Sequence, residues 1–175
     1  MKKILFYSLS VLMVFSIVSC SSQKKLANQH HKDLEDVYKS LKSEMPEAMV
    51  TMDGEKVKVV LPESVLFSKN SADLNKDYLP ILAKMARILN KYQKTSIMIS
   101  GYTDISGTEA YNMDLSKKRA ENAKQVFLNN AVKENRMFTW GRGPKDPIAD
   151  NATEAGRAQN RRVEYVILYD YKPEQ

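Results

Sequence analysis

Two polar residues interrupt the apolar face of a helix that the sequence predicts from about Asn112 to Asn130. Placed at about 100° per residue, its apolar side chains share an arc of about 140°, and they are Leu115, Ala120, Ala123, Val126 and Phe127. Asn112 and Arg119 fall inside the same arc. Because a guanidinium keeps its charge, burying Arg119 beneath a helix requires an anionic partner. Asp104, at the end of the preceding predicted strand, is well placed for this role, so the chemistry indicated is charge pairing.

Two interpretations of these residues are open. In the first, Asp104 and Arg119 form an internal ion pair and Asn112 caps the helix. In the second, the two charges stand apart and offer one negative and one positive group to a zwitterionic ligand. Physical chemistry alone favours the first, because buried Arg–Asp pairs are common and ligand sites are few. The position of the polar groups near the helix start, beside the turn between Gly101 and Gly107, keeps the second open.

The elements that must hold these residues follow from local patterns. Alternating apolar residues on both sides of Asp53-Gly54 predict a hairpin, and Pro80 suits the first turn of an amphipathic helix. We expect a hairpin from 48 to 61, a helix at 78–92, a strand at 95–100 ended by Gly101, the helix at 112–130, strands at 136–140 and 162–169, and loop at 141–160. This order predicts an α+β sandwich in which two helices pack on one face of a mixed sheet.

The first nineteen residues have the layout of a secretory signal. Lys2 and Lys3 precede an almost unbroken apolar run at residues 4–17, which is shorter than the roughly 20 residues that cross a bilayer. The segment Ile17-Val18-Ser19-Cys20 resembles the lipobox of bacterial lipoproteins, in which a peptidase cuts before the cysteine. Cys20, the only cysteine, is therefore expected to carry lipid such as palmitate. Position 21 is Ser and not the Asp that often retains such lipoproteins in the inner membrane, which favours the outer membrane.

The chain is accordingly expected to have three segments. Residues 1–19 form the signal peptide, and residues 20–47 comprise the lipidated cysteine and a polar, partly helical stalk. A thin stripe that includes Leu34, Val37 and Leu41 supports the helical part of this stalk. Residues 48–175 form the folded domain.

Composition and motifs argue against several classes of function. After removal of residues 1–19 the net charge is 25 − 21 = +4, and the positive residues are scattered, so no nucleic acid partner is expected. His30 and His31, the only histidines, would point about 100° apart on a helix, so neither a metal nor a cofactor is expected. We expect no enzyme, because catalytic motifs are missing and the acids considered as candidates look isolated: Glu63, Asp73, Asp77 and Asp104.

A set of motifs in fixed order resembles the OmpA-like C-terminal domain, the family that includes peptidoglycan-associated lipoproteins. The main motif is Gly101-Tyr102-Thr103-Asp104-x-x-Gly107-x-x-x-Tyr111-Asn112-x-x-Leu115-Ser116-x-x-Arg119-Ala120, followed by Asn160-Arg161-Arg162-Val163-Glu164. Phe67, Asn70, Gly141-x-Gly143 and Pro147 also match, and the similarity covers about Val57 to Tyr169. This resemblance implies a β-α-β-α-β-β sandwich preceded by a hairpin strand.

The resemblance also implies non-covalent binding of the peptidoglycan stem peptide through its diaminopimelate residue. Asp104 would hold the ligand ammonium and Arg119 its carboxylate, with Asn70, Asn112 and Arg161 beside them. Arg162 is expected to be surface charge at the start of a strand.

Tyr102 replaces a histidine that is common in the family, and it could line the pocket rim or only pack. The expected role is a tether between the outer membrane and the wall, with the domain facing the periplasm. The alternative is an envelope or division-complex protein of Tol-Pal type in which contacts to other proteins dominate.

Overall fold

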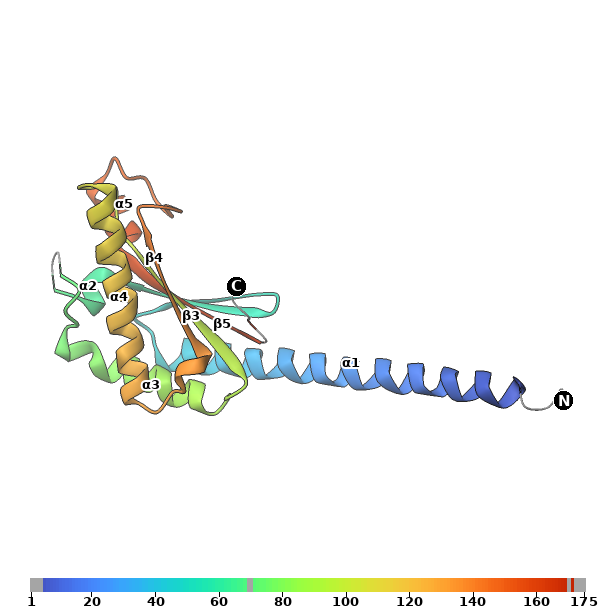
Figure 1. Ribbon diagram of the computed structural model, residues 1–175. Coiled ribbons are helices and arrows are strands. Elements are labelled where there is room, and N and C mark those ends of the chain that lie inside the picture. The colour runs from blue at the N-terminus through green and yellow to red at the C-terminus, as the bar shows by residue number, and fades with distance from the viewer. Residues whose placement is uncertain (1–4, 69–70, 170, 172–175) are drawn as a thin grey trace. The chain divides into compact units, whose positions relative to one another are not determined.

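Figure 1 shows the computed structural model of the protein, which describes residues 5–68, 71–169 and 171, with only the backbone described for residues 5–21. The chain divides into two compact units, residues 1–33 and 34–175. Helix α1 (Leu5–Glu44) makes up the described part of the first unit. Most side chains between residues 22 and 33 are exposed, which fits the polar sequence there. Within the described residues, no helix meets the length and apolarity needed to span a bilayer.

The last turns of α1 differ from the expected stalk. Leu34, Val37, Leu41 and Met45 are fully buried and belong to the core of the second unit. The compact unit therefore begins at Leu34, before the boundary at residue 48 that the sequence indicated. The physical reason is that the thin apolar stripe is too short to form a helical pair of its own, and its side chains are removed from water in the common core instead.

The second unit is built on a five-stranded sheet among the described residues, in the order β1-β2-β5-β3-β4. Its strands are β1 (Met49–Asp53), β2 (Lys56–Pro62), β3 (Thr95–Tyr102), β4 (Met137–Gly143) and β5 (Arg162–Tyr169). Only β3 and β4 pair in parallel, and the other neighbours are antiparallel. The predicted hairpin is confirmed, with Gly54 at a positive φ of 53° in its turn. The last strand in the chain thus lies at the centre of the sheet.

Helices α3 (Leu79–Asn90) and α4 (Glu109–Asn129) pack against one face of this sheet, and in Figure 1 α3 lies across the lower end of α4. The described residues also contain four shorter helices, α2 (Glu63–Leu66), η1 (Lys76–Tyr78), η2 (Glu134–Arg136) and α5 (Glu154–Asn160). The inward residues of the central strands, such as Val59, Ile99 and Tyr165, meet the helices in a common core. The predicted α+β sandwich with two helices on one face of a mixed sheet is confirmed.

Gly101 does not end β3, because the strand continues through Tyr102. An added Cβ at Gly101 would lie 2.1 Å from the carbonyl oxygen of Ser116 in α4. Gly141 in β4 faces the same helix, where a Cβ would lie 2.8 Å from the backbone nitrogen of Lys117. These glycines therefore let α4 lie directly on the two strands, which no larger residue would allow.

The segment 141–160 is not all loop, contrary to expectation. It contains the end of β4 and the short helix α5 (Glu154–Asn160), which is capped by the side chain of Thr153. Asn160 at its end bonds the backbone nitrogens of Ile148 and Ala149 and the carbonyl of Ala149. The preceding loop is thereby fixed, and α5 is held above the start of β5.

Candidate ligand-binding site

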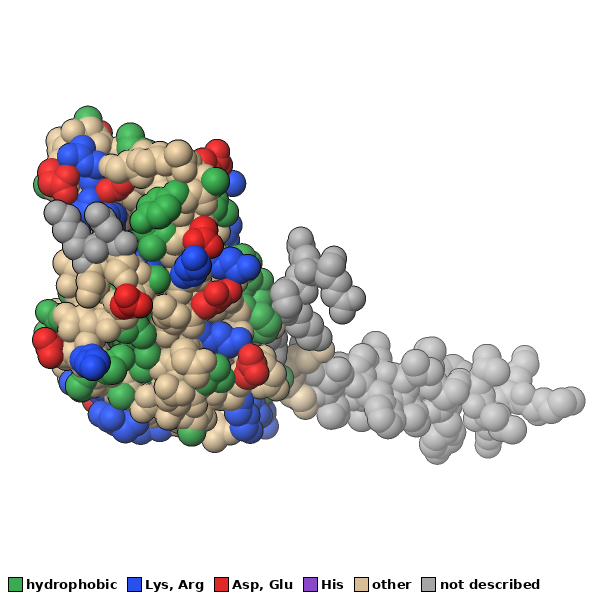
Figure 2. All heavy atoms as spheres, turned by 60° about the vertical axis from the view of Figure 1, so that its left-hand side comes forward, with side chains coloured by type: hydrophobic (Ala, Val, Ile, Leu, Met, Phe, Trp, Pro, Cys, Tyr) green, Lys and Arg blue, Asp and Glu red, His purple; other side chains and the backbone are tan. Residues whose placement is uncertain are grey.

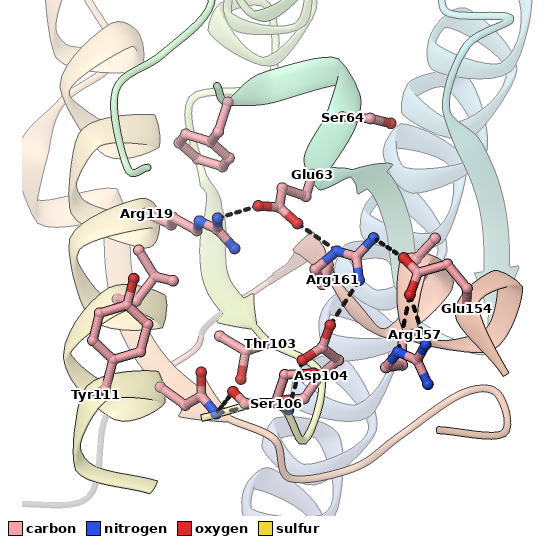
Figure 3. A pocket seen from close by; sticks show the side chains of 14 residues that line it. Glu63, Ser64, Thr103, Asp104, Ser106, Tyr111, Arg119, Glu154, Arg157 and Arg161 are labelled. Carbon is pink, nitrogen blue, oxygen red and sulfur yellow. Dashed lines mark hydrogen bonds and ion pairs between the residues drawn. The ribbon is translucent and has the colours of Figure 1, made fainter. Parts of the chain in front are cut away.

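A cavity of about 710 Å³ lies where α2, the end of β3, α4 and α5 meet (Figure 3). Its charged lining side chains are three acids and three bases: Glu63, Asp104, Glu154, Arg119, Arg157 and Arg161. The sheet topology explains this gathering, because the end of β2 and the end of β3 both pair with the start of β5, one on each side of it. The cavity therefore combines a large volume with balanced charge.

Arg119 is 1% exposed and lies on the apolar face of α4, as the helical pattern predicted. Its Nη2 donates to Glu63 Oε1 and its Nε donates to the carbonyl of Ser71 at 3.0 Å. The ring of Phe67 covers the guanidinium, with 5.3 Å between its central carbon and the ring centre. Burial lowers the pKa of Arg119, and the carboxylate of Glu63 counteracts this effect, so the group is a charged donor at neutral pH.

Asp104 is 6% exposed and accepts hydrogen bonds on both oxygens. The backbone nitrogen of Ser106 donates to Oδ1 at 2.7 Å, and Arg161 Nη1 donates to Oδ2 at 2.7 Å. Burial alone would raise the pKa of this carboxyl, but the hydrogen bonds from Arg161 and Ser106 outweigh burial and lower it. Asp104 therefore carries its negative charge throughout the neutral and mildly acidic range.

The internal pairing of Asp104 with Arg119 is wrong, since the two side chains bind different partners. Asn112 does not cap the helix either, because the hydroxyl of Thr108 accepts from the backbone nitrogen of Tyr111 in that role. The amide of Asn112 instead donates to the carbonyls of Ser106 at 2.9 Å and Asp104 at 3.4 Å. It thus holds the turn that carries the Asp104 carboxylate, and the two charges stand apart as the second interpretation required.

Glu63 joins the two halves of the site. Its Oε1 accepts from Arg119 and its Oε2 lies 2.7 Å from Arg161 Nε, so Figure 3 shows the alternating sequence Arg119–Glu63–Arg161–Asp104. The sequence-based view of Glu63 and Asp104 as isolated acids is therefore wrong. The sequence carries no local signal for this role, because it depends on the pairing of β2 with β5, which brings the backbone nitrogen of Glu63 to the carbonyl of Arg161.

The remaining candidate residues differ in whether they line the cavity. Arg161 lines the cavity, whereas Asn70 lies outside the described residues. Arg162 is not surface charge, because it is buried and its guanidinium stacks 3.8 Å from the ring centre of Tyr102. It also bonds Glu164 at 2.8 Å. Tyr102 therefore packs against Arg162 and is not among the side chains that line the cavity.

The family of the chain follows from comparison with known sequences. A model described as the OmpA family matches residues 66–161, more than half of the 175 residues. The chain belongs to the OmpA family. The matched range contains Asp104, Asn112, Arg119 and Arg161, and Glu63 lies just before it.

Relatives of this OmpA family chain include lipoproteins and a cell wall anchor. The probable lipoprotein YiaD of Escherichia coli is 38% identical over 118 residues, which are 67% of this chain and 54% of the relative, so the chain spans about half its length. The structure of the peptidoglycan-associated lipoprotein of Burkholderia pseudomallei is 32% identical with a TM-score of 0.55, covering 58% of this chain and 86% of that one. The cell wall anchor of the T6SS from Pseudomonas aeruginosa is 26% identical with a TM-score of 0.69, covering 77% and 97%.

The surface around the OmpA family core carries charges of both signs. On the face shown in Figure 2, basic and acidic side chains are interspersed and do not gather into one broad field. On this face, no large patch of one sign competes with the balanced charges of the cavity for an ionic ligand.

Proposed function

We propose that this protein is an outer-membrane lipoprotein that binds peptidoglycan non-covalently and tethers the membrane to the wall. The observation that carries the proposal is the presence of Asp104 and Arg119 in one cavity, each buried and each charged. A diamino acid of the stem peptide offers an ammonium to Asp104 and a carboxylate to Arg119, and such charge-assisted hydrogen bonds are about twice as strong as neutral ones. The proposed role of this site is to bind the ligand, without a catalytic step.

The names of the relatives support the same function. The Burkholderia structure is that of a peptidoglycan-associated lipoprotein, and the Pseudomonas structure is that of a cell wall anchor. The Escherichia coli relative is a probable lipoprotein. Transfer of these properties to this chain rests on the shared domain together with the residues of the cavity.

The proposed anchor is lipid on Cys20, after removal of residues 1–19. Residues 20–33 would then separate the lipid from the compact unit that begins at Leu34. One acyl chain holds a protein only marginally on a membrane, so anchoring requires at least two chains on the new N-terminus. The domain would face the periplasm, where the wall lies.

Wall binding can be tested with soluble protein from Ser21 onward. It should sediment with isolated sacculi, and free 2,6-diaminopimelate should release it, because both compete for Asp104 and Arg119. Pimelate, which has the same carbon chain and carboxylates but no amines, is the matched control and should release much less. Sedimentation that diaminopimelate leaves unchanged at millimolar concentration would place wall binding elsewhere on the molecule.

Replacement of Cys20 by serine should move the full chain from the membrane fraction to the soluble fraction. The substitution removes the thiol that would carry lipid and alters nothing in the compact unit, which begins at Leu34. Fractionation with labelled palmitate measures both the location and the lipid. Ser19→Ala is the control, since it changes a neighbouring residue and keeps the thiol. Equal labelling of Cys20→Ser and wild-type protein contradicts the proposed anchor.

A further inference from the structure

Arg161 already occupies the place that the proposed ligand ammonium would take. Its Nη1 lies 2.7 Å from Asp104 Oδ2, its Nε lies 2.7 Å from Glu63 Oε2 and its Nη2 lies 3.1 Å from Glu154 Oε1. The side chain of Arg161 is 27% exposed against 9% for that of Asp104, and Figure 3 shows it between Asp104, Glu63 and Glu154. The carboxylate of Asp104 is therefore already paired with a cation before any ligand arrives.

Both oxygens of Asp104 already accept a hydrogen bond. Oδ1 accepts from the backbone nitrogen of Ser106 at 2.7 Å, a contact within the turn itself. Oδ2 accepts from Arg161, the one of the two donors that belongs to a side chain and can be displaced. The contact that has to break is the one between Nη1 and Oδ2.

The buried hydroxyl of Thr103 also lines this part of the cavity. Thr103 is 4% exposed, lines the cavity next to Asp104, and its Oγ1 has no hydrogen-bond partner in the described part of the chain. A buried polar atom without a partner is costly and needs an explanation. A ligand ammonium carries three donors, so it can bond Asp104 Oδ2 and Thr103 Oγ1 together, which Arg161 Nη1 does not do here.

We propose that Arg161 is an internal competitor of the ligand ammonium and thereby selects ligands that carry an amine and a carboxylate together. This inference rests on the proposed function, since it concerns the same cavity. When an ammonium takes Asp104, Nη1 of Arg161 is released and donates to the ligand carboxylate, which Arg119 also binds. Its Nε stays on Glu63, so the guanidinium turns without leaving the cavity.

Charge balance explains the selectivity. A zwitterion replaces the single Asp104–Arg161 contact by two, Asp104 with the ammonium and Arg161 with the carboxylate. An amine alone breaks the same contact and leaves Nη1 unpaired beside a second cation. A carboxylate alone adds negative charge to a site whose three acids and three bases are already matched. Only the ligand with both groups gains a contact.

The test compares ligands of one carbon skeleton on the full chain, purified in detergent. Calorimetry measures the Kd of 2,6-diaminopimelate and of 1,5-diaminopentane, the same molecule without its carboxylates. Arg161→Gln should tighten 1,5-diaminopentane binding by about tenfold, because the competitor is gone and Asp104 is open. The ratio of the Kd of 1,5-diaminopentane to the Kd of 2,6-diaminopimelate should therefore fall by at least about tenfold. An unchanged ratio, or weaker binding of both ligands, overturns the proposal.

Lys124→Gln is the matched control, because it removes one cation from an ion pair outside the cavity. Lys124 lies 3.1 Å from Glu134, and neither residue is among those that line the cavity. This variant should keep the wild-type ratio. Arg161→Lys, which retains a cation and hence the fold around Asp104, should keep most of the selectivity. A ratio as low as that of Arg161→Gln in either variant overturns the proposal.

The two proposals can fail separately. If wild-type protein binds sacculi but Arg161→Gln leaves the ratio unchanged, peptidoglycan binding stands and the competitor role is wrong. If wild-type protein binds neither sacculi nor diaminopimelate, but Arg161→Gln binds 1,5-diaminopentane through Asp104, the competitor role stands alone. The double variant Asp104→Asn/Arg161→Gln must lose that diamine binding. If it does not, Asp104 is not the amine site and the inference fails.

Discussion

Replacing Asp104 with asparagine should weaken sedimentation of the protein with isolated sacculi by on the order of 100-fold, the effect expected for loss of a buried charge pair. The amide keeps the size of the carboxyl and can still accept from the backbone nitrogen of Ser106. It cannot balance an ammonium. Arg161 retains Glu63 and Glu154, so the cost to folding should be only about 1 kcal/mol.

The control for this variant is Asp114→Asn, the same chemical change on α4. Asp114 is exposed and pairs with Lys118 at 2.7 Å, a surface contact that solvent screens and that contributes little to stability. It should sediment as the wild-type protein does. A melting curve shows whether each variant is folded. A folded Asp104→Asn protein that still pellets fully with the wall would exclude Asp104 from the site.

Gly101→Ala should destabilise the compact unit by at least about 3 kcal/mol, a large part of the roughly 5–15 kcal/mol that holds a domain folded. The added Cβ would lie 2.1 Å from the carbonyl oxygen and 3.0 Å from the carbonyl carbon of Ser116. Both atoms belong to the backbone of α4, so no side-chain rotation can relieve the clash. The helix has to move away from β3, and Arg119 moves with it.

Urea denaturation measures this effect as a lower midpoint. Gly54→Ala is the matched control, because an added Cβ there meets nothing within 4 Å. Its positive φ of 53° adds only about 1 kcal/mol of strain. If both variants unfold at the same urea concentration, the close approach of α4 to β3 is not what Gly101 provides.

Local patterns were sufficient where neighbouring residues decide the structure. The hairpin around Gly54 and the helix that contains Pro80 are confirmed close to their predicted bounds. The position of Asn112 and Arg119 on the apolar side of α4 is confirmed as well. Helical periodicity depends on residues within a few turns, so the sequence carries it directly.

The partners of the charged side chains could not be predicted in the same way. Glu63 lies 56 residues before Arg119 in the chain, in a four-residue helix with no periodicity to identify it. The register of β2 on β5, which places Pro62 opposite Arg162, brings Glu63 to Arg161. Strand pairing is a property of the folded sheet. The contact between Glu63 and Arg161 can therefore be predicted only once the register of β2 on β5 is known.

The structure also differs from the sequence-based prediction at α5 and at Arg162, and both differences have local causes. Helix α5 was hidden because its segment is rich in glycine and proline, yet Thr153 supplies a cap and Gly156 allows the backbone of Asp150 to come close. The sequence predicts surface charge for Arg162 because a basic residue at a strand start is usually exposed. Its neighbour across the sheet is Tyr102, and the aromatic ring covers it.

The central place of β5 in the sheet determines when the ligand site forms during folding. The strand is made last, yet it lies between β2 and β3 and pairs with both along its length. Until it arrives, a nascent chain has two unjoined half-sheets and lacks Arg161, which directly precedes the strand. Such long-range pairing is slow to form, in the millisecond-to-second range for sheet-rich domains. Pairing of β5 therefore completes the sheet that holds Asp104 and Arg119 in one cavity, and it adds Arg161 to that cavity in the same step.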